Sequence, residues 1–507
     1  MLYIITVFPN NAPIHSWAQR SGAPRLQAQS TTSGGVQKKQ RCIAWCRNIS
    51  RRSSPKSKPG GVAGLPQFVK DEFDAFLECG ILARGFLRLR CAECVHEKLV
   101  AFSCKRRGFC PSCGARRMAE TAAYLVDSVI PRVPVRQWVL SFPIPLRTLF
   151  AAHPDLLAPV LQIIHRVIAT FLIQQAGVKR SEAATGAITL IQRFGSAANL
   201  NIHLHGLVLD GVYRTTGEGA PVFHQAPAPT LEQLQALLGK IITRILRLLT
   251  RQGHLVEEEG VTYLADANGF TDPDNVLVPL QAASCTYRIA LGPRAGRKVL
   301  SLHYAPSRPA PITQQRCANA HGFSLHAGVR CDADQRQGLE HLCRYITRPA
   351  IANERLSVNR AGQVVLKLKT AFRDGTTHIV MSPLEFMQRL AALVPRPRLH
   401  LIRFHGVLAP NAKLRAAIVP GAAQRETGRE ADHAPAHGAP ARMSWARLLK
   451  RVFDIDIEHC PQCGGRLKII AAIEEPAVIV KILTHLGLPA RTPPRSPARP
   501  LALIEAA

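Results

Sequence analysis

Three features that would each indicate a particular class of protein are scarce or missing. Aromatic residues make up only 6% of the 507 residues, which argues against a nucleic-acid surface built from many stacked rings. We find no run of about twenty apolar residues, so we expect no membrane-spanning helix and no membrane partner. The apolar stretch MLYIITVF is short, lacks a basic lead and does not resemble an export signal. We therefore expect a cytoplasmic protein whose 14 cysteines are reduced thiols or metal ligands rather than disulfides.

Acidic residues are also scarce relative to basic ones. Thirty-four Asp and Glu face 65 Lys and Arg, which leaves a formal charge of +31 and a pI near 10.3. The excess is not confined to the termini. A polyanionic partner is the simplest reason for such a charge, and nucleic acid is the commonest one. The alternative is a solvated basic surface with basic tails.

Composition divides the chain into five segments. They are a basic tail (1–64), a cysteine-dense module (65–123), a mixed domain (124–420), a linker (421–443), and a C-terminal segment with a single CxxC knuckle and a Pro-rich tail (444–507). In the mixed domain, strand-like runs such as RQWVLSFPI and AITLIQRF alternate with helix-like runs such as LEQLQALLGKIITRILRLLTRQG. The order predicts an α+β fold, although strand neighbours cannot be assigned from the sequence.

The cysteine-dense module contains two CxxC pairs separated by fifteen residues. They are Cys91 with Cys94 and Cys110 with Cys113, and four thiolates in this spacing predict a tetrahedral structural Zn²⁺ site. Cys104 is left over as a buried free thiol. In the C-terminal segment, Cys460 and Cys463 have the same knuckle shape without a visible partner pair. Basic side chains between the two pairs of the module and after the second are predicted to contact DNA phosphates, with a solvated loop as the alternative; they are Lys105, Arg106, Arg107, Arg116 and Arg117.

The stretch NLNIHLHGLVLDGVY places His203 and His205 two residues apart in an apolar strand. Alternate residues of a strand share a face, so the two imidazoles lie about 7 Å apart and can converge on one divalent ion. Apolar residues on both faces predict a covered central strand. A histidine-triad hydrolase would need a third histidine where Leu207 stands, and a cupin would need a carboxylate that Asp210 fits badly. A third alternative pairs the strand with a nucleophilic tyrosine on a helix.

Such a helix is predicted in DQRQGLEHLCRYITRPAIANERL. Its apolar stripe consists of Leu339, Leu342, Cys343 and Ile346, and Pro349 ends it. Tyr345 lies beside this stripe between Arg344 and Arg348, which are candidates for DNA contact. A phenol is a weak nucleophile near neutral pH, so it would need nearby cations and a metal-polarised phosphate. For a single tyrosine on a helix, ordinary packing is the competing interpretation.

Five segments in this order resemble the rolling-circle transposases of the insertion-sequence ninety-one type, in the HUH endonuclease superfamily. They are GFCPSCGARR, IQRFGSAANLNIHLHGLVLDGVY, CRYITRPAIANERL, RDGTTHIVMSPLEFMQRLAALVPRPRLHLIRFHGVLAPNAKLR and CPQCGG. The resemblance covers about residues 65 to 470. It implies an antiparallel sheet flanked by helices and a nuclease that nicks one strand at the element's end. It also implies that His203 and His205 hold Mg²⁺ or Mn²⁺, and that attack by Tyr345 leaves a 5′-phosphotyrosine and a free 3′ hydroxyl.

One departure from the family concerns the tyrosine helix. Some relatives carry two tyrosines four residues apart, whereas His341 occupies the first position here, which is typical of the single-tyrosine branch. One nucleophile must then serve both cleavages, or a second protomer must help. His341 is a candidate third ligand or proton carrier, and Gln192 is the main candidate for the third metal ligand, with an ordinary backbone-bonding glutamine as the alternative. Arg403 and His405 share a strand face without an assigned role.

The expected partner is therefore single-stranded or element-end DNA in the bacterial nucleoid. A homo-oligomer and the host replication machinery are further candidate partners. A competing hypothesis is a non-catalytic, zinc-dependent DNA-binding protein, such as a decayed transposase. A third is a metallohydrolase that acts on small phosphoesters.

Overall fold

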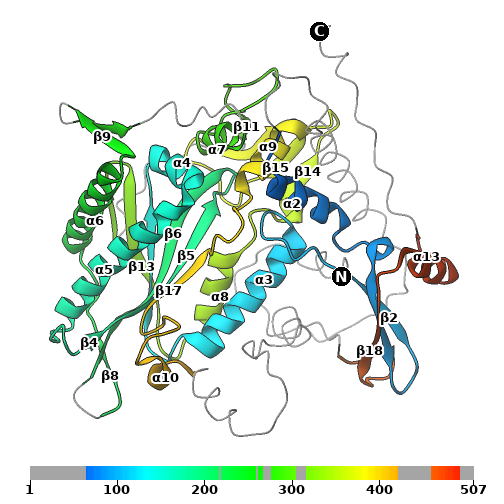
Figure 1. Cartoon of the computed structure of the whole chain (residues 1–507), viewed down its shortest axis with the longest axis horizontal. Coiled ribbons are helices and arrows are strands. Elements are labelled where there is room, and N and C mark those ends of the chain that lie inside the picture. The colour runs from blue at the N-terminus through cyan, green and yellow to red at the C-terminus, as the bar shows by residue number, and fades with distance from the viewer. Residues whose placement is uncertain are drawn as a thin grey trace. The chain divides into compact units, whose positions relative to one another are not determined.

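A computed structural model describes residues 64–215, 219–258, 261–265, 276–303, 316–420 and 458–490 (Figure 1). Almost all of the predicted basic tail and the whole predicted linker lie outside these residues. The chain forms two compact units. The larger contains residues 107–443, and the smaller combines residues 70–106 with residues 444–507.

The larger unit is built on a six-stranded sheet with the order β12-β13-β3-β6-β5-β17. Its strands are β12 (Cys317–Ala320), β13 (Phe323–Cys331), β3 (Val135–Ser141), β6 (Leu200–Leu209), β5 (Gly186–Phe194) and β17 (Ile402–Gly406). Every neighbouring pair is antiparallel. The α+β fold with an antiparallel sheet is confirmed, and the histidine strand β6 is central to it.

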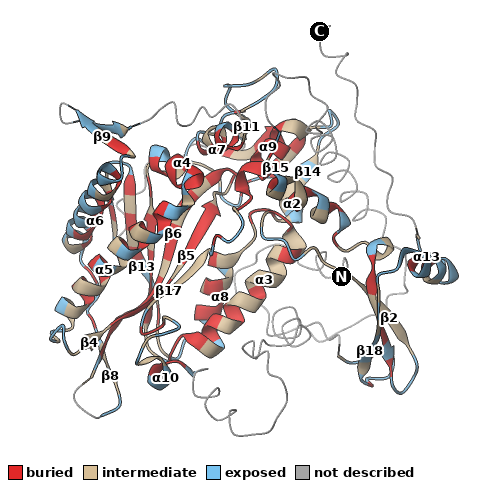
Figure 2. Cartoon of the chain, in the orientation of Figure 1, coloured by how far each residue is buried: buried red, intermediate tan, exposed pale blue. Residues whose placement is uncertain are grey.

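Helices cover both faces of this sheet (Figures 1 and 2). One face carries α5 (Leu157–Gln175) and α6 (Leu231–Arg251), and the ring of Phe171 in α5 meets Trp138 of β3 edge-on with centroids 6.2 Å apart. The other face carries α3 (Pro111–Tyr124) and α8 (Arg336–Thr347), which pack against each other. Buried side chains concentrate on the sheet and on the inner sides of these helices.

Helix α5 bears on the expectation that no helix spans a membrane. With the turn before it (Pro154–Gln175), it is the one helix among the described residues that is long and apolar enough to cross a membrane by length and composition. Half of its apolar window is buried inside the protein, and eight of its side chains belong to the core. These contacts are those of a core helix in a folded domain.

Smaller elements complete the larger unit. A four-stranded sheet has the order β11-β16-β15-β14, with β11 (Leu300–His303), β16 (Thr376–Met381), β15 (Val364–Lys367) and β14 (Leu356–Val358). Two further small sheets contain β4 (Ala183–Ala184), β7 (Gly211–Arg214) and β8 (Val222–Gln225), and β10 (Val261–Leu264) and β9 (Leu255–Glu258). The remaining helices are α4 (Ile144–Ala152), α7 (Leu277–Cys285), α9 (Pro383–Leu393) and α10 (Arg415–Ile418).

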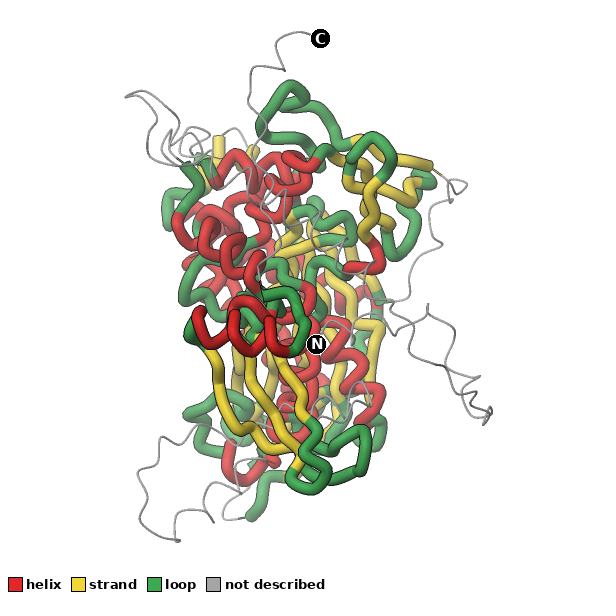
Figure 3. The backbone as a smooth tube through the Cα atoms, turned by 90° about the vertical axis from the view of Figure 1, so that its right-hand side faces the viewer, coloured by secondary structure: helices red, strands yellow, loops and turns green. Residues whose placement is uncertain are grey.

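The smaller unit joins segments from opposite ends of the chain. Its sheet has the order β18-β1-β2, with β1 (Phe86–Cys91) between β2 (Glu97–Ala101) and β18 (Leu467–Ile473) (Figure 3). Helix α13 (Pro476–His485) contributes Ile479 and Leu483 to a small core with Phe86. Most of α2 (Gln67–Glu78) also belongs to this unit. Composition predicts that residues 444–507 are separate from the cysteine module, whereas β18 is an edge strand of the module's sheet. Strand partners this far apart in sequence leave no local signal.

Candidate active site and cysteine clusters

The two histidines of β6 point towards the tyrosine helix. Leu207 and Leu209, at the next alternate positions of β6, belong to one buried cluster with Leu339 and Ile346 of α8. Because alternate residues of a strand share a face, His203 and His205 lie on the face that α8 covers. Their rings meet at a centroid distance of 4.9 Å.

Hydrogen bonds define which imidazole nitrogens are available. The Nδ1 of His203 lies 2.9 Å from the backbone carbonyl oxygen of Asn201, and since a carbonyl only accepts, Nδ1 carries the proton. The Nδ1 of His205 lies 2.9 Å from the side-chain amide of Gln137 on β3. The Nε2 of His205 is buried and has no hydrogen-bond partner among the described residues. Nδ1 of His203 is thus oriented as in metal-binding histidines, which donate this N–H to an acceptor. The amide nitrogen of Gln137 only donates, so Nδ1 of His205 would donate in the same way once the Gln137 amide turns its oxygen towards it.

Both imidazoles are held in the neutral form. Burial lowers the pKa of His203, and the charges of Arg147 and Arg348 lower it further. Burial, together with His203 and Arg348, lowers the pKa of His205 to about 3. Neutral imidazole is the form that can coordinate a metal ion, through its unprotonated ring nitrogen.

Tyr345 lies in a cationic pocket at the C-terminal end of α8. The guanidinium carbon of Arg348 is 4.3 Å from the centre of its ring, and Nζ of Lys369 is 4.8 Å away. Burial alone would raise the pKa of Tyr345, but a hydrogen bond from Arg348 and the charges of Arg348 and Lys369 outweigh it, so the net shift of the pKa is downward. The pocket has a volume of about 210 Å³ and also includes Phe194 and Arg355. Tyr345 itself is 46% exposed.

Two side chains connect the histidine pair with the tyrosine. The charge of Arg348, whose guanidinium lies against the ring of Tyr345, lowers the pKa of both histidines. Gln192 of β5 pairs in register with His203 and donates its side-chain amide to the carbonyl oxygen of Ile346, 2.7 Å away. The amide nitrogen of Gln192 therefore makes the backbone bond of the alternative interpretation, and only its amide oxygen could act as a ligand. This bond therefore links the cross-strand neighbour of His203 to the residue that follows Tyr345 in α8.

The other predicted DNA-contact residues differ in their surroundings. Arg344 pairs with the carboxylate of Glu340 at 2.9 Å, and Arg107 donates to the carbonyl oxygen of Leu399 at 2.8 Å. Both guanidinium groups thus have protein partners in addition to any role on DNA. Lys105 and Arg106 are exposed, and Arg116 and Arg117 are half-buried on α3. His341 is exposed one helical turn before Tyr345.

Asp210, which a cupin would use as a ligand, has a structural role. Its carboxylate is only 2% exposed and accepts two hydrogen bonds from Arg136, at 2.8 and 2.7 Å. A further bond comes from Arg330 at 2.8 Å. These two arginines join β3 and β13 at the end of β6, and they occupy the carboxylate that a metal would need.

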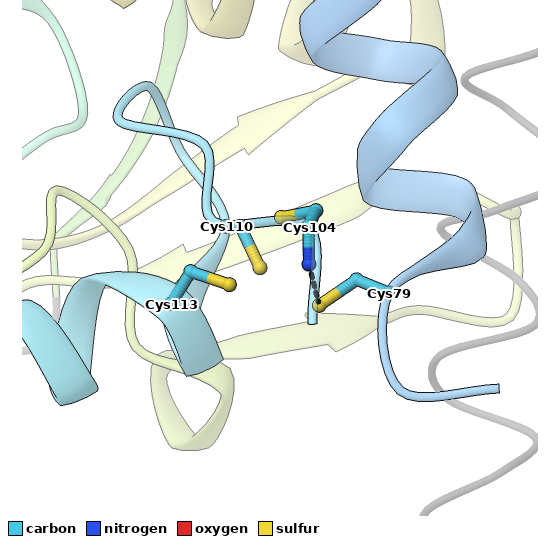
Figure 4. A group of neighbouring side chains, drawn as sticks. All are labelled: Cys79, Cys104, Cys110 and Cys113. Carbon is cyan, nitrogen blue, oxygen red and sulfur yellow. Dashed lines mark hydrogen bonds between the residues drawn. The ribbon is translucent and has the colours of Figure 1, made fainter. Parts of the chain in front are cut away.

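The cysteines form two clusters, in each of which the four sulfur atoms lie within 4.8 Å of one another. The first consists of Cys79, Cys104, Cys110 and Cys113, and the backbone N–H of Cys104 donates to the sulfur of Cys79 at 3.4 Å (Figure 4). The second consists of Cys91, Cys94, Cys460 and Cys463.

The four cysteines predicted to form a single site, Cys91, Cys94, Cys110 and Cys113, are therefore divided between two clusters. The two CxxC pairs of the module belong to different clusters, because pairing of β1 with β18 brings the C-terminal knuckle beside the first of them. Cys104 is a cluster member and not a spare thiol. Cys79, which the sequence analysis did not assign, is the partner of Cys104; neither lies in a CxxC pair, so spacing gave no signal for them.

Two protein-family models match the chain. The transposase family model Y2_Tnp matches residues 186–415, and the transposase zinc-binding domain of the IS91 type matches residues 27–142. The chain belongs to the IS91-type transposases. The first range includes His203, His205 and Tyr345, and the second covers six of the eight clustered cysteines. No curated protein and no solved structure matches the chain.

The assignment bears on the cofactor and the partner. The zinc-binding domain and the cysteine clusters make this transposase a Zn²⁺ protein. DNA is its partner, in agreement with the charge of +31.

Proposed function

We propose that this transposase nicks and rejoins single DNA strands through a covalent bond between Tyr345 and a DNA 5′ phosphate. Tyr345 Oη attacks the scissile phosphorus, the bond between phosphorus and the 3′ oxygen breaks, and the 3′ oxygen leaves as a hydroxyl after taking up a proton. A 3′ hydroxyl of a second strand then attacks the phosphotyrosine and releases the phenol. The phosphate bond energy is kept, so strand transfer requires no nucleotide hydrolysis.

The position of Arg348 is the observation that supports this proposal best. One guanidinium lies 4.3 Å from the ring centre of Tyr345 and also acts electrostatically on both histidines. A phosphodiester bound at this cation would lie near the nucleophile and near the histidine pair together. Arginine is well suited to that role because its planar fork matches phosphate oxygens.

The histidine pair fits a catalytic Mg²⁺ or Mn²⁺ ion. Nε2 of His203 is left with a free lone pair by the bond from Nδ1 to Asn201. The buried Nε2 of His205 has no protein partner among the described residues, and it would offer its lone pair once the Gln137 amide turns its oxygen towards Nδ1. Gln192 would offer its amide oxygen as a third ligand. When bound, the ion would withdraw charge from the scissile phosphate. Lys369 and Arg348 would stabilise the phenolate of Tyr345, and exposed His341, one turn away, is placed to carry a proton.

A nicking assay tests the proposal. Labelled single-stranded oligonucleotides carrying element-end sequence are incubated with the full chain in Mg²⁺, in Mn²⁺ or in chelator. We expect metal-dependent cleavage that Tyr345→Phe reduces by roughly 10³-fold or more, as expected for loss of a nucleophile. Tyr263→Phe, at an exposed tyrosine of β10, is the matched control and should cleave normally.

Two results would overturn the proposal. Binding of DNA without cleavage would favour a non-catalytic zinc-dependent DNA-binding protein. Turnover of small phosphoesters by the Tyr345→Phe protein, with no DNA adduct from the parent, would favour a metallohydrolase.

A further inference from the structure

The second cysteine cluster joins two knuckles that are distant in sequence. The sulfur atoms of Cys91 and Cys463 lie 3.5 Å apart, and so do those of Cys94 and Cys460, across sequence separations of 372 and 366 residues. These distances far exceed the roughly 2.05 Å of a disulfide bond. All four residues belong to the smaller unit.

The two knuckles have the same local geometry. The N–H of Glu93 donates to the sulfur of Cys91 at 3.5 Å, and the N–H of Gln462 donates to the sulfur of Cys460 at 3.4 Å. In both cases the donor stands two residues after the first cysteine of its pair. The N–H of Gly465 adds a bond of 3.4 Å to Cys463. Backbone donors of this kind stabilise thiolates, which are the form that binds a metal ion.

Backbone conformation supports the similarity of the knuckles. The residue after the second cysteine has a positive φ in both, 62° for Val95 and 76° for Gly464. Glycine adopts this conformation freely, whereas a β-branched valine adopts it only under strain. Such strain persists where the surroundings determine the conformation. A metal ion that holds Cys91 and Cys94 would do so.

The C-terminal knuckle is also closely fitted against the first. A Cβ atom on Gly465 would lie 2.6 Å from Cδ of Glu93, the end of a flexible side chain, and 3.0 Å from the sulfur of Cys91, so the two knuckles approach each other closely here. Beyond the knuckle, β18 pairs with β1, and Ile479 and Leu483 of α13 pack on Phe86. The C-terminal segment is therefore an integral part of the unit.

We propose that Cys91, Cys94, Cys460 and Cys463 bind a second structural Zn²⁺ ion, which ties the C-terminal segment to the N-terminal cysteine module. The matched zinc-binding domain ends at residue 142, so two of the four ligands lie outside it. The set of four ligands is complete only when both the N-terminal and the C-terminal knuckle are present. This inference does not depend on the proposed nuclease activity, because zinc content and strand nicking are measured separately.

Metal analysis of the purified full chain tests the proposal. We expect two zinc ions per chain, one fewer in Cys460→Ser, and one fewer in Cys110→Ser, which affects only the first cluster. Cys317→Ser is the control, because Cys317 is half-buried and belongs to neither cluster, and it should keep both ions. One zinc ion in the parent, or two in Cys460→Ser, would overturn the proposal.

A second measurement avoids substitutions that could prevent folding. The parent protein is treated with a thiol-alkylating reagent, with and without a zinc chelator, and the labelled peptides are mapped. Cys94 and Cys463 are exposed, so without a metal they would react readily. We expect all four thiols to be protected together and to become reactive together on chelation. Labelling of Cys463 without chelator, or disulfide-linked peptides in their place, would contradict the proposal.

Discussion

The histidine–tyrosine site and the second cysteine cluster bring their side chains together in opposite ways. At the first, both histidines come from one strand, and a single packed helix supplies the tyrosine, so one sheet face positions the site. At the second, two turns 366 residues apart in sequence converge. The first is expected to govern reaction rate and the second to govern metal content and the integrity of the smaller unit. Substitutions that change the nicking rate without changing the zinc content therefore test whether the two regions have these separate roles.

After loss of the nucleophile itself, the largest effect is expected at the histidines. His203→Ala and His205→Ala should each lower metal-dependent nicking by more than about 100-fold, because each removes a proposed ligand of the catalytic ion. Zinc content should stay unchanged, since neither residue belongs to a cysteine cluster. Parallel nicking assays and metal analysis check both statements. A variant that lost zinc together with activity would break the distinction between the two regions.

A smaller effect is expected at Gln137, whose amide holds Nδ1 of His205. Gln137→Leu should lower the affinity for the catalytic ion by about 10- to 100-fold, the usual range for a group that orients a ligand. Titration of nicking activity with Mg²⁺ and Mn²⁺ measures this change, and high metal concentration should restore much of the rate. An unchanged metal requirement would show that Gln137 does not orient the ligand.

The smallest effect is a shift in the pH dependence of the rate, which is measured at saturating DNA so that it is separate from any loss of phosphate binding by Arg348. The hydrogen bond and charge of Arg348 lower the pKa of Tyr345, so Arg348→Ala should raise that pKa. If the phenolate attacks, the rising limb of the rate profile moves to higher pH, with a loss of about tenfold at neutral pH for each pKa unit gained. Arg344→Ala is the matched control, because Arg344 pairs with Glu340 instead. Equal profiles for the parent and Arg348→Ala would contradict this role.

The comparison also explains what the sequence could predict. The alternation that placed His203 and His205 on one face, and the apolar stripe of the tyrosine helix, are local patterns, and the structure has both on the expected elements. Gln192 was chosen from its place on the preceding strand, with a backbone-bonding role as the alternative; the structure shows such a bond, and only its partner, Ile346, could not be predicted.

Contacts between distant segments could not be predicted in the same way. A CxxC spacing predicts that two sulfurs reach one ion, but it does not say which other pair completes the site. The cluster of Cys91 depends on the pairing of β1 with β18, and Cys79 and Cys104 have no spacing signal at all. Gln137 and Lys369 were missed for a similar reason, since only the folded sheet and loops bring them to the histidine and tyrosine side chains.

Mapping the covalent adduct tests the central claim most directly. The full chain is incubated with a labelled oligonucleotide and Mg²⁺, digested, and searched for the peptide that carries the nucleotide. We predict a single modified residue, Tyr345, with no adduct in His205→Ala or in chelator. Cleavage with the adduct on another tyrosine, or cleavage without any adduct, would contradict the claim that Tyr345 and the histidine pair act on one phosphodiester.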